Sequence, residues 1–310
     1  MTPLTPDAVM AQIATALPQE CRQDVIIIGS LAAGYHFFSG DGQRSIRTKD
    51  VDCMFAPHAR AVSAAGQVTE RLLAAAWQPR REGEWGKPGD EATPDDQLPM
   101  IRLKPPSGEG RTDWFLELLG APDQSSAQAK SFYRVRTSIG HFAICSFNYL
   151  ALAECKPIQT QHGLRIARPE MMALANMLHH PAIGPELIAG TATKRSNKDL
   201  GRVLALAWLT AERDRREGTD ELDAWAERMV DALHERFPER AKDLAEGAGA
   251  GLRDLMASEG DLDEALAICN RGLLASMEVG REAFAATGRR VIQQVVEPLA
   301  ETASFPARRI

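Results

Sequence analysis

The stretch VIIIGSLAAGYHFF, residues 25–38, decides the fold together with RTKDVDCMF, residues 47–55. The first stretch begins with four β-branched residues, which predict a short buried strand over 25–28. A Gly-Ser turn ends that strand, and the apolar residues after it predict a helix over 31–38. The predicted order is therefore strand, tight turn, helix, polar loop and a second strand.

The second stretch places two acids inside an apolar run. Acidic and apolar residues alternate over 50–55, which is the periodicity of a strand with Asp50 and Asp52 on one face. Acids rarely lie in a buried strand unless something positive meets them there. Magnesium prefers carboxylate and phosphate oxygens, and two ions about 3.5–4 Å apart can bind an attacking hydroxyl and a leaving pyrophosphate together. We therefore predict that Asp50 and Asp52 hold two Mg²⁺ ions.

The Gly-Ser turn suits a phosphate ligand. Gly29 lets the backbone approach a triphosphate closely, and the predicted helix start at Leu31 offers free N–H groups. The Ser30 hydroxyl can donate one hydrogen bond to a phosphate oxygen. Such a turn is a weak signal by itself, because any tight strand-to-helix turn favours glycine. Its place before the two acids gives it weight, and we predict that Gly29 and Ser30 bind a nucleotide.

A third carboxylate is needed beside the metals, where it can help remove the proton from the attacking hydroxyl. The segment TDWFLELLG offers Asp113 and Glu117, which share a strand face with Phe115 between them. Glu117 lies within an apolar run, as Asp52 does in its own strand, whereas Asp113 lies at the edge, where a turn acid is expected anyway. We favour Glu117 as the third carboxylate and keep Asp113 as the alternative.

The composition is that of an ordinary globular protein, with 44% hydrophobic and 25% charged residues in 310. A net charge of −6 argues against non-specific coating of nucleic acid, although it allows a local basic patch. The N-terminus has no signal-peptide pattern, and no apolar run approaches the roughly 18 residues of a membrane span. Five scattered cysteines without a CxxC pair favour neither a disulfide framework nor a zinc site. We expect a cytoplasmic protein with no membrane partner.

The pattern of elements changes along the chain. Further strand signals follow in MIRLKPP, DWFLELLG, FYRVRTS and HFAICS, and the first two predict a hairpin. From Lys198 onward almost every segment is helical. We predict two domains, with strands and helices in residues 1–160 and an all-α domain in residues 161–310.

These motifs resemble a known family. Gly29-Ser30 followed by Thr48-Lys49-Asp50-Val51-Asp52 resembles the nucleotidyltransferase signature of the DNA polymerase β superfamily. The closest similarity is to AbiEii-like and minimal bacterial members, including toxin-type enzymes, in which a Gly-Gly or Gly-Ser turn precedes a T-x-D-[IV]-D strand. A second similarity lies in GLRIARPEMMALANMLHH followed by KRSNKDLGRVLALAWL. The resemblance covers roughly residues 24–210.

The resemblance implies an α+β fold: a mixed α/β sheet with flanking helices forms a nucleotidyltransferase core, followed here by the all-α C-terminal domain. It implies transfer of a nucleoside monophosphate from an NTP such as ATP, with Asp50 and Asp52 as ligands of two Mg²⁺ ions. It also implies a role near the nucleotide for Lys198 and Asp199, although these residues suit a charged first helical turn equally well. Lys49 and Lys198 are the candidate charge partners for phosphates.

No motif in the sequence identifies the acceptor. An RNA hydroxyl such as a tRNA 3′ end, a protein side chain and a small molecule such as an aminoglycoside all remain open. The resemblance to toxins favours RNA or protein, and it implies a possible antitoxin partner in a toxin–antitoxin or phage-defence system. A candidate basic rim for an acidic acceptor, for which solvated surface charge is the equal alternative, comprises Arg134, Arg136, Lys194 and Arg195.

Two other classes of protein are compatible with the motifs. A nucleotide-binding regulatory protein that has lost catalysis would lack the third carboxylate, for which two candidates are present here. A metal-dependent phosphohydrolase also uses paired carboxylates, but the sequence has no His-Asp metal dyad. Nucleotidyl transfer is therefore the leading hypothesis.

Overall fold

The computed structural model describes residues 3–42, 44–80, 87–106, 114–123, 130–183 and 186–302. The chain forms two compact units, residues 1–167 and residues 168–310. The strands β8 (Ile158–Gln159) and β9 (Arg165–Ile166) belong to the first unit. The predicted division between residues 160 and 161 falls in the turn that joins these two strands.

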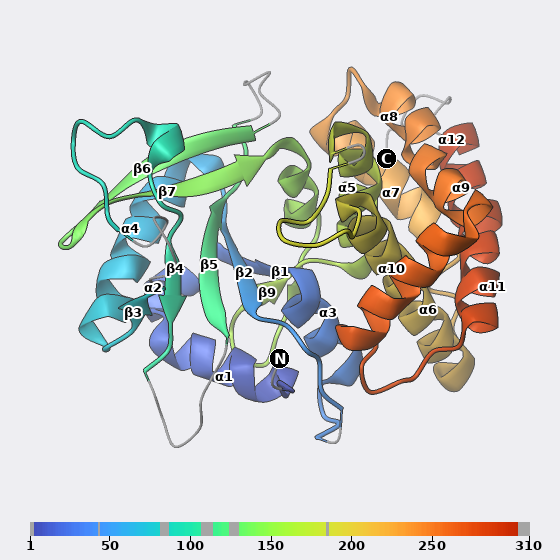
Figure 1. Ribbon diagram of the computed structural model, residues 1–310, viewed down its shortest axis with the longest axis horizontal. Helices are drawn as coiled ribbons and strands as arrows, with labels where there is room; N and C mark the ends of the chain where they lie inside the picture. Colours follow the sequence, from blue (N-terminus) through green and yellow to red (C-terminus); the bar gives the residue numbers. More distant parts are fainter. Residues whose placement is uncertain are drawn as a thin grey trace. The chain divides into compact units, whose positions relative to one another are not determined.

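The first unit is built on one mixed sheet with the strand order β3-β4-β5-β2-β1-β9-β8 and with β7 paired to both β5 and β6. Figure 1 shows β5, β2 and β1 side by side in this unit. The remaining strands are β1 (Val25–Ile28), β2 (Asp50–Phe55), β3 (Gln78–Pro79), β4 (Arg102–Lys104), β5 (Phe115–Gly120), β6 (Lys130–Thr137) and β7 (Gly140–Phe147).

Both strand directions occur around the centre of the sheet. Strand β2 runs antiparallel to β1 and parallel to β5, while β4 pairs with β5 in the antiparallel sense. The antiparallel pairing of β4 with β5 confirms the predicted pairing of MIRLKPP with DWFLELLG. The mixed sheet with helices is also as predicted, and β1 and β2 have the predicted bounds.

One face of the sheet is covered by helix α4 (His58–Ala74). A Cβ built on Gly120 of β5 would lie 3.7 Å from the Cβ of Ala61 in α4. Side chains alternate along a strand, so Gly120, Leu118 and Leu116 face α4 and Glu117 lies on the opposite face. In the described residues, the other helices of this unit are α1 (Pro6–Ala16), α2 (Gln19–Arg22), α3 (Gly29–Phe38) and the 3₁₀ helices η2 (Asp95–Gln97) and η3 (Asn148–Glu154).

Helix α3 begins at Gly29, two residues before the predicted start at Leu31. Gly29 has a φ of +71°, which reverses the chain within one residue after the extended Ile28. Ser30 is therefore already helical. The Gly-Ser pair is the first turn of the helix and not a linker that precedes it.

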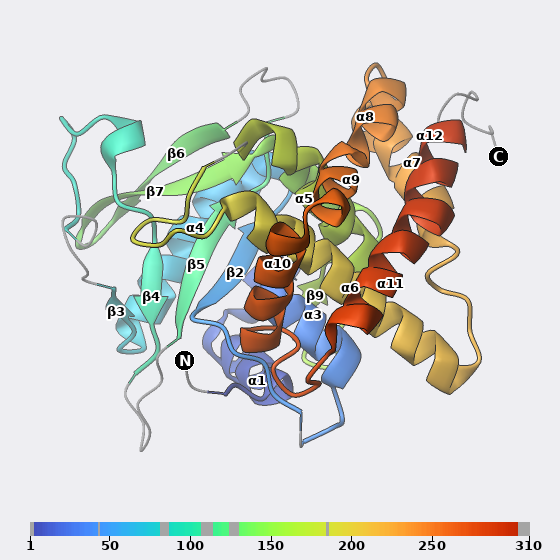
Figure 2. The same cartoon turned by 45° about the vertical axis from the view of Figure 1, so that its right-hand side comes forward.

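The second unit is mainly helical in its described residues, with an isolated β-bridge between Leu187 and Lys194 in the connection from α5 to α6. Helices α5, α10 and α11 all pack on α6, which is the central helix of the unit (Figure 2). None of the helices described is both long enough and apolar enough to cross a membrane. The helices are α5 (Pro169–Ile183), α6 (Arg195–Glu217), α7 (Trp225–Arg236), α8 (Ala241–Ala248), α9 (Ala250–Ala257), α10 (Glu259–Arg271), α11 (Arg281–Val291), the π-helical η4 (Ile292–Val296) and α12 (Glu297–Thr302).

A buried carboxylate fixes the connection between α6 and α7. Asp214 accepts hydrogen bonds from the Thr219 hydroxyl at 2.6 Å and from the N–H groups of Glu221 and Leu222 at 3.0 Å. Burial alone would raise the pKa of Asp214, but these hydrogen bonds and the charge of Arg290 hold it below its ordinary value. The carboxylate is therefore a structural anchor for this turn.

Candidate active site

The register of β2 and β5 places three acids on one face of the sheet. Asp52 lies directly opposite Glu117, and Asp50 lies opposite Phe115. Directly opposite residues share a face, and adjacent strands lie about 4.8 Å apart. Asp50, Asp52 and Glu117 therefore lie on the face that α4 does not cover. The shared face of Asp50 and Asp52 is as their spacing predicts, and the register adds Glu117 to it.

The turn at Gly29 lies against the Asp52 carboxylate. Ile28, the last residue of β1, is opposite Asp52 in the sheet. A Cβ built on Gly29 would lie 2.6 Å from Asp52 Oδ2, and Gly29 also has a positive φ. Both the backbone conformation and the space available require glycine here. The first turn of α3 is thus held next to the Asp52 carboxylate.

The Asp50 carboxylate is oriented by a neighbour that the sequence analysis did not assign to the site. The hydroxyl of Thr48 lies 2.7 Å from Asp50 Oδ1 and 3.0 Å from the Asp50 carbonyl oxygen, and Thr48 is buried. A donated hydrogen bond restricts the rotation of a carboxylate and so fixes the direction of its free oxygen. Thr48 is part of the quoted TKDVD motif, but the spacing alone gave it no chemical role.

Glu117 has a strong partner of its own. Arg102 of β4, directly opposite Glu117, donates two hydrogen bonds of 3.1 Å to its two carboxylate oxygens. The Glu117 side chain is 14% exposed and that of Arg102 is 38% exposed. This is the paired geometry in which a guanidinium binds a carboxylate most specifically.

The pairing of Glu117 with Arg102 leaves Asp50 and Asp52 as the candidate metal ligands. Within the described ranges, no three His, Cys, Asp or Glu side chains form a group that could hold a metal ion. The oxygen donors of Asp50 and Asp52 suit a hard cation such as Mg²⁺, which commonly takes one or two protein carboxylates together with substrate phosphates. The two aspartates therefore fit the ion by their chemistry, whereas Glu117 does not complete the site while Arg102 holds it.

Basic residues flank the acids on the same sheet face. The Arg80 N–H donates to the Arg102 carbonyl at 2.8 Å, and the Arg80 guanidinium lies 4.1 Å from the centre of the Phe115 ring. Lys104 lies two residues after Arg102 on β4 and therefore shares its face. Arg80, Arg102 and Lys104 were not predicted as site residues. The alternation in RLK indicates two basic side chains on one face of a strand, but the sequence does not give the register of this strand against Glu117.

The remaining predicted residues of the first unit are placed as follows. Ser30 is half-buried in the first turn of α3, and Lys49 is exposed immediately before β2. The Lys49 carbonyl accepts a hydrogen bond of 2.8 Å from the Phe115 N–H, which extends the pairing of β2 with β5. Asp113, the alternative third carboxylate, lies outside the described residues.

Lys198 and Asp199 lie on α6 in the helical unit. Asp199 Oδ2 is 3.5 Å from Nδ1 of His179 on α5. Burial alone would raise the pKa of Asp199, but the hydrogen bond with His179 and the positive charges of Arg202 and Lys198 hold it below its ordinary value. The contact of Asp199 with His179 therefore joins α6 to α5. The role of Asp199 near a nucleotide stays a prediction.

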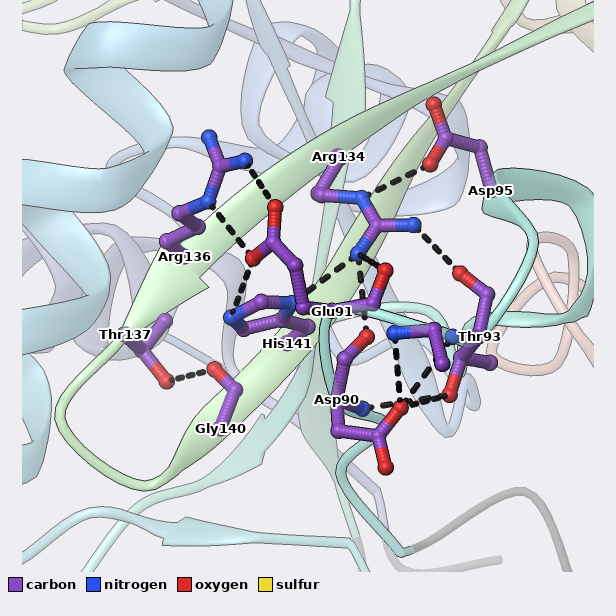
Figure 3. Close-up of polar contacts among 10 residues, drawn as sticks. Asp90, Glu91, Thr93, Asp95, Arg134, Arg136, Thr137, Gly140 and His141 are labelled. Atoms are coloured by element: carbon purple, nitrogen blue, oxygen red, sulfur yellow. Dashed lines mark hydrogen bonds and ion pairs between the residues drawn. The ribbon is translucent and has the colours of Figure 1, made fainter.

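The candidate basic rim consists of arginines and a lysine that already have local partners. Figure 3 shows Arg134 directed at the segment 90–95, where it binds Asp95 at 2.8 Å, and Arg136 paired with Glu91 at 2.6 Å. In the second unit, the two ion pairs are Lys194–Asp261 at 2.8 Å and Arg195–Glu186 at 3.1 Å. These contacts favour the alternative of compensated surface charge.

Comparison with known proteins adds little to this site. No protein-family model and no curated protein matches the chain. A solved structure, that of an antigenic nucleotidyltransferase-like protein from Paracoccidioides brasiliensis, is similar with 14% identity and a TM-score of 0.33. The similarity covers 78% of this chain and 94% of that chain. A likeness of this size assigns no activity, ligand or partner to the present chain.

Proposed function

We propose that the protein is a magnesium-dependent nucleotidyltransferase that moves a nucleoside monophosphate from an NTP to an acceptor hydroxyl and releases pyrophosphate. The observation that carries the proposal is the placement of Asp50, Asp52 and Glu117 on one face of two adjacent strands. The first turn of α3 lies directly beside Asp52. A carboxylate cluster next to a helix N-terminus is the combination that a metal-bound triphosphate requires.

Each residue has a definite task in this proposal. When bound, Mg²⁺ would neutralise charge on the phosphates and polarise the α-phosphate. Asp50 and Asp52 hold the ions, and Thr48 fixes the orientation of Asp50. The N–H groups of the first turn of α3 and the Ser30 hydroxyl bind phosphate oxygens. Glu117, once released by Arg102, accepts the proton of the attacking hydroxyl.

The proposed acceptor is RNA, such as a tRNA 3′ end, or a protein side chain. The sequence resemblance to AbiEii-like and toxin-type nucleotidyltransferases supports this choice, as well as an antitoxin partner. The basic residues Arg80, Arg102 and Lys104 next to the carboxylates support an acceptor or donor that carries phosphates. A small-molecule acceptor such as an aminoglycoside is the alternative outcome of the test below.

The test is an incubation of purified protein with each α-labelled NTP, Mg²⁺ and either total tRNA, protein extract or aminoglycoside. The variant is Asp52→Asn, which keeps the shape of the side chain that packs against Gly29. The matched control is Asp95→Asn, since Asp95 is a half-exposed aspartate of the same unit, paired with Arg134. We expect label transfer by the wild type and by Asp95→Asn and none by Asp52→Asn. Transfer by Asp52→Asn would contradict the proposal.

A second candidate is a nucleotide-binding regulatory protein without catalysis. The specific observation in its favour is the Arg102–Glu117 ion pair, which leaves the third carboxylate occupied. This candidate predicts that the wild type binds NTP and Mg²⁺ but transfers no label to any acceptor. The same incubation, combined with equilibrium dialysis of the labelled NTP, therefore distinguishes the two functions.

A further inference from the structure

Arg102 and Glu117 form an arginine–carboxylate pair on the candidate active-site face. The two residues are opposite each other in neighbouring strands and are joined by two hydrogen bonds of 3.1 Å. Both backbones are therefore held by the sheet, and only the side chains have freedom to move. With 38% of its side chain exposed, Arg102 has room to adopt another position.

The second position for the guanidinium is defined by the register of the sheet. Arg102, Glu117 and Asp52 form one row across three adjacent strands. Neighbouring strands are about 4.8 Å apart, so the backbone of Arg102 lies about 10 Å from that of Asp52. An extended arginine side chain covers much of this distance. A phosphate that is bound at Asp52 is thus within reach of Arg102.

The balance of charge changes when a ligand binds. Without a ligand, the Arg102 guanidinium neutralises Glu117 next to two further carboxylates. A metal ion that enters beside Asp52 would repel the Arg102 guanidinium, which has the same sign of charge, and attract the Glu117 carboxylate, which has the opposite sign. The triphosphate brought by the same ion offers oxygen acceptors that match the planar fork of a guanidinium as well as a carboxylate does.

We infer that Arg102 exchanges partners: it holds Glu117 away from metal in the nucleotide-free protein and moves to a phosphate oxygen when the metal–nucleotide complex binds. Arg102 is therefore a positioning residue that acts through Glu117, and the third carboxylate becomes available only when the nucleotide is present. The inference rests on the proposed function, because it takes Asp50 and Asp52 as the metal site.

The first arm of the test measures Mn²⁺ alone, without nucleotide, by electron paramagnetic resonance. The variant Arg102→Gln frees Glu117, and we expect it to bind Mn²⁺ about tenfold more tightly than the wild type. The matched control is Arg80→Gln, which removes a neighbouring charge from the same face and leaves the Arg102–Glu117 pair intact, and we expect a change of less than about twofold. In the double variant Arg102→Gln/Glu117→Gln the gain should disappear.

The second arm measures the α,β-methylene analogues of the four NTPs with Mg²⁺ by titration calorimetry. We expect Arg102→Gln to bind the analogue more weakly than the wild type, because the phosphate loses its guanidinium partner. The variant Arg102→Lys keeps the charge without the two-pronged geometry and should be intermediate. A purely structural role for Arg102 would weaken both ligands together, so the opposite signs of the two effects are the signature of exchange.

Either of two results would overturn the inference: equal changes of Mn²⁺ affinity in Arg102→Gln and Arg80→Gln, or weaker binding of both Mn²⁺ and nucleotide in Arg102→Gln. The variant Asp52→Asn separates this failure from that of the proposed function. If Asp52→Asn loses Mn²⁺ binding, the metal site at Asp52 stands and only the partner exchange of Arg102 is refuted. Unchanged Mn²⁺ binding in Asp52→Asn refutes the metal site, and the partner exchange with it.

Discussion

Two pairs of glutamate and arginine in the first unit have the same chemistry and different surroundings. Glu117 and Arg102 lie on adjacent strands, and the Glu117 side chain is 14% exposed beside two more carboxylates. Glu91 and Arg136 lie at the surface, with side chains 71% and 66% exposed. The first pair is part of a sheet face that carries two further carboxylates, Asp50 and Asp52, whereas the second lies in a surface cluster with Arg134 and His141.

The difference in surroundings distinguishes a charged cluster that is a candidate site from one that holds the local structure together. In the surface cluster, Arg134 donates to the carbonyl oxygens of Asp90 and Thr93 and to the carboxylate of Asp95 (Figure 3). Its hydrogen bonds are used to hold a loop on the β6–β7 hairpin. On the candidate active-site face, Asp50, Asp52, Glu117 and Arg102 are held by adjacent strands of the sheet and not by a surface loop.

The largest expected effect comes from exchanging the two glutamates for glutamine. Glu117→Gln should lower the rate of nucleotidyl transfer by about 10²- to 10⁴-fold, because the amide cannot accept the proton of the attacking hydroxyl. Glu91→Gln is the matched control and should transfer at the wild-type rate. Single-turnover transfer of labelled NMP measures both. Equal transfer rates in Glu117→Gln and Glu91→Gln would contradict a catalytic role for Glu117.

A smaller effect is expected at Thr48, whose hydroxyl supports Asp50. Thr48→Val keeps the shape of the side chain but removes the hydrogen bond. Transfer should fall by roughly 10- to 100-fold, as is usual for residues that orient a metal ligand. Thr48→Ser keeps the hydroxyl and should restore most of the activity. A Thr48→Val enzyme with normal Mg²⁺ dependence would show that Asp50 needs no such support.

Asp214 extends the comparison to a carboxylate whose hydrogen bonds come from a hydroxyl and two backbone N–H groups. Asp214→Asn should lower the free energy of unfolding by about 1–3 kcal/mol, measured by urea denaturation. The folded pKa of Asp214 is depressed, so its contribution is present above the unfolded pKa of about 3.9 and is lost as the pH falls through the folded value. The stability difference between wild type and variant should therefore shrink in acid. A difference independent of pH would contradict this assignment.

The smallest effect on function is expected at Arg134, which holds segment 90–95 on the hairpin. Arg134→Ala should leave transfer unchanged and lower the free energy of unfolding by about 1–3 kcal/mol through the lost backbone contacts. Hydrogen exchange of amides in residues 89–97 should become faster. A large loss of transfer in Arg134→Ala would mean that the surface cluster belongs to the active site after all.

Local patterns were sufficient to predict the central part of the fold. The strands over 25–28 and 50–55, the shared face of Asp50 and Asp52, and the pairing of the Glu117 strand with the strand before it all follow from periodicity and turn composition. These features depend on neighbours in the sequence, and alternation alone fixes which side chains share a face.

Long-range registers were not predictable in the same way. The position of Arg102 opposite Glu117 depends on the length and conformation of the connection between two strands. The contact of Asp199 with His179 depends on how α5 packs on α6. The early start of α3 depends on the positive φ of Gly29, which the sequence permits but does not require.

The most direct test of the central claim is a crystal structure of the protein with Mn²⁺ and an α,β-methylene NTP analogue, in which anomalous scattering locates the metal. We predict Mn²⁺ bound to Asp50 and Asp52, with the triphosphate against the first turn of α3 and Arg102 turned from Glu117 to a phosphate oxygen. Metal and nucleotide bound away from the face of β2 and β5 would contradict the account.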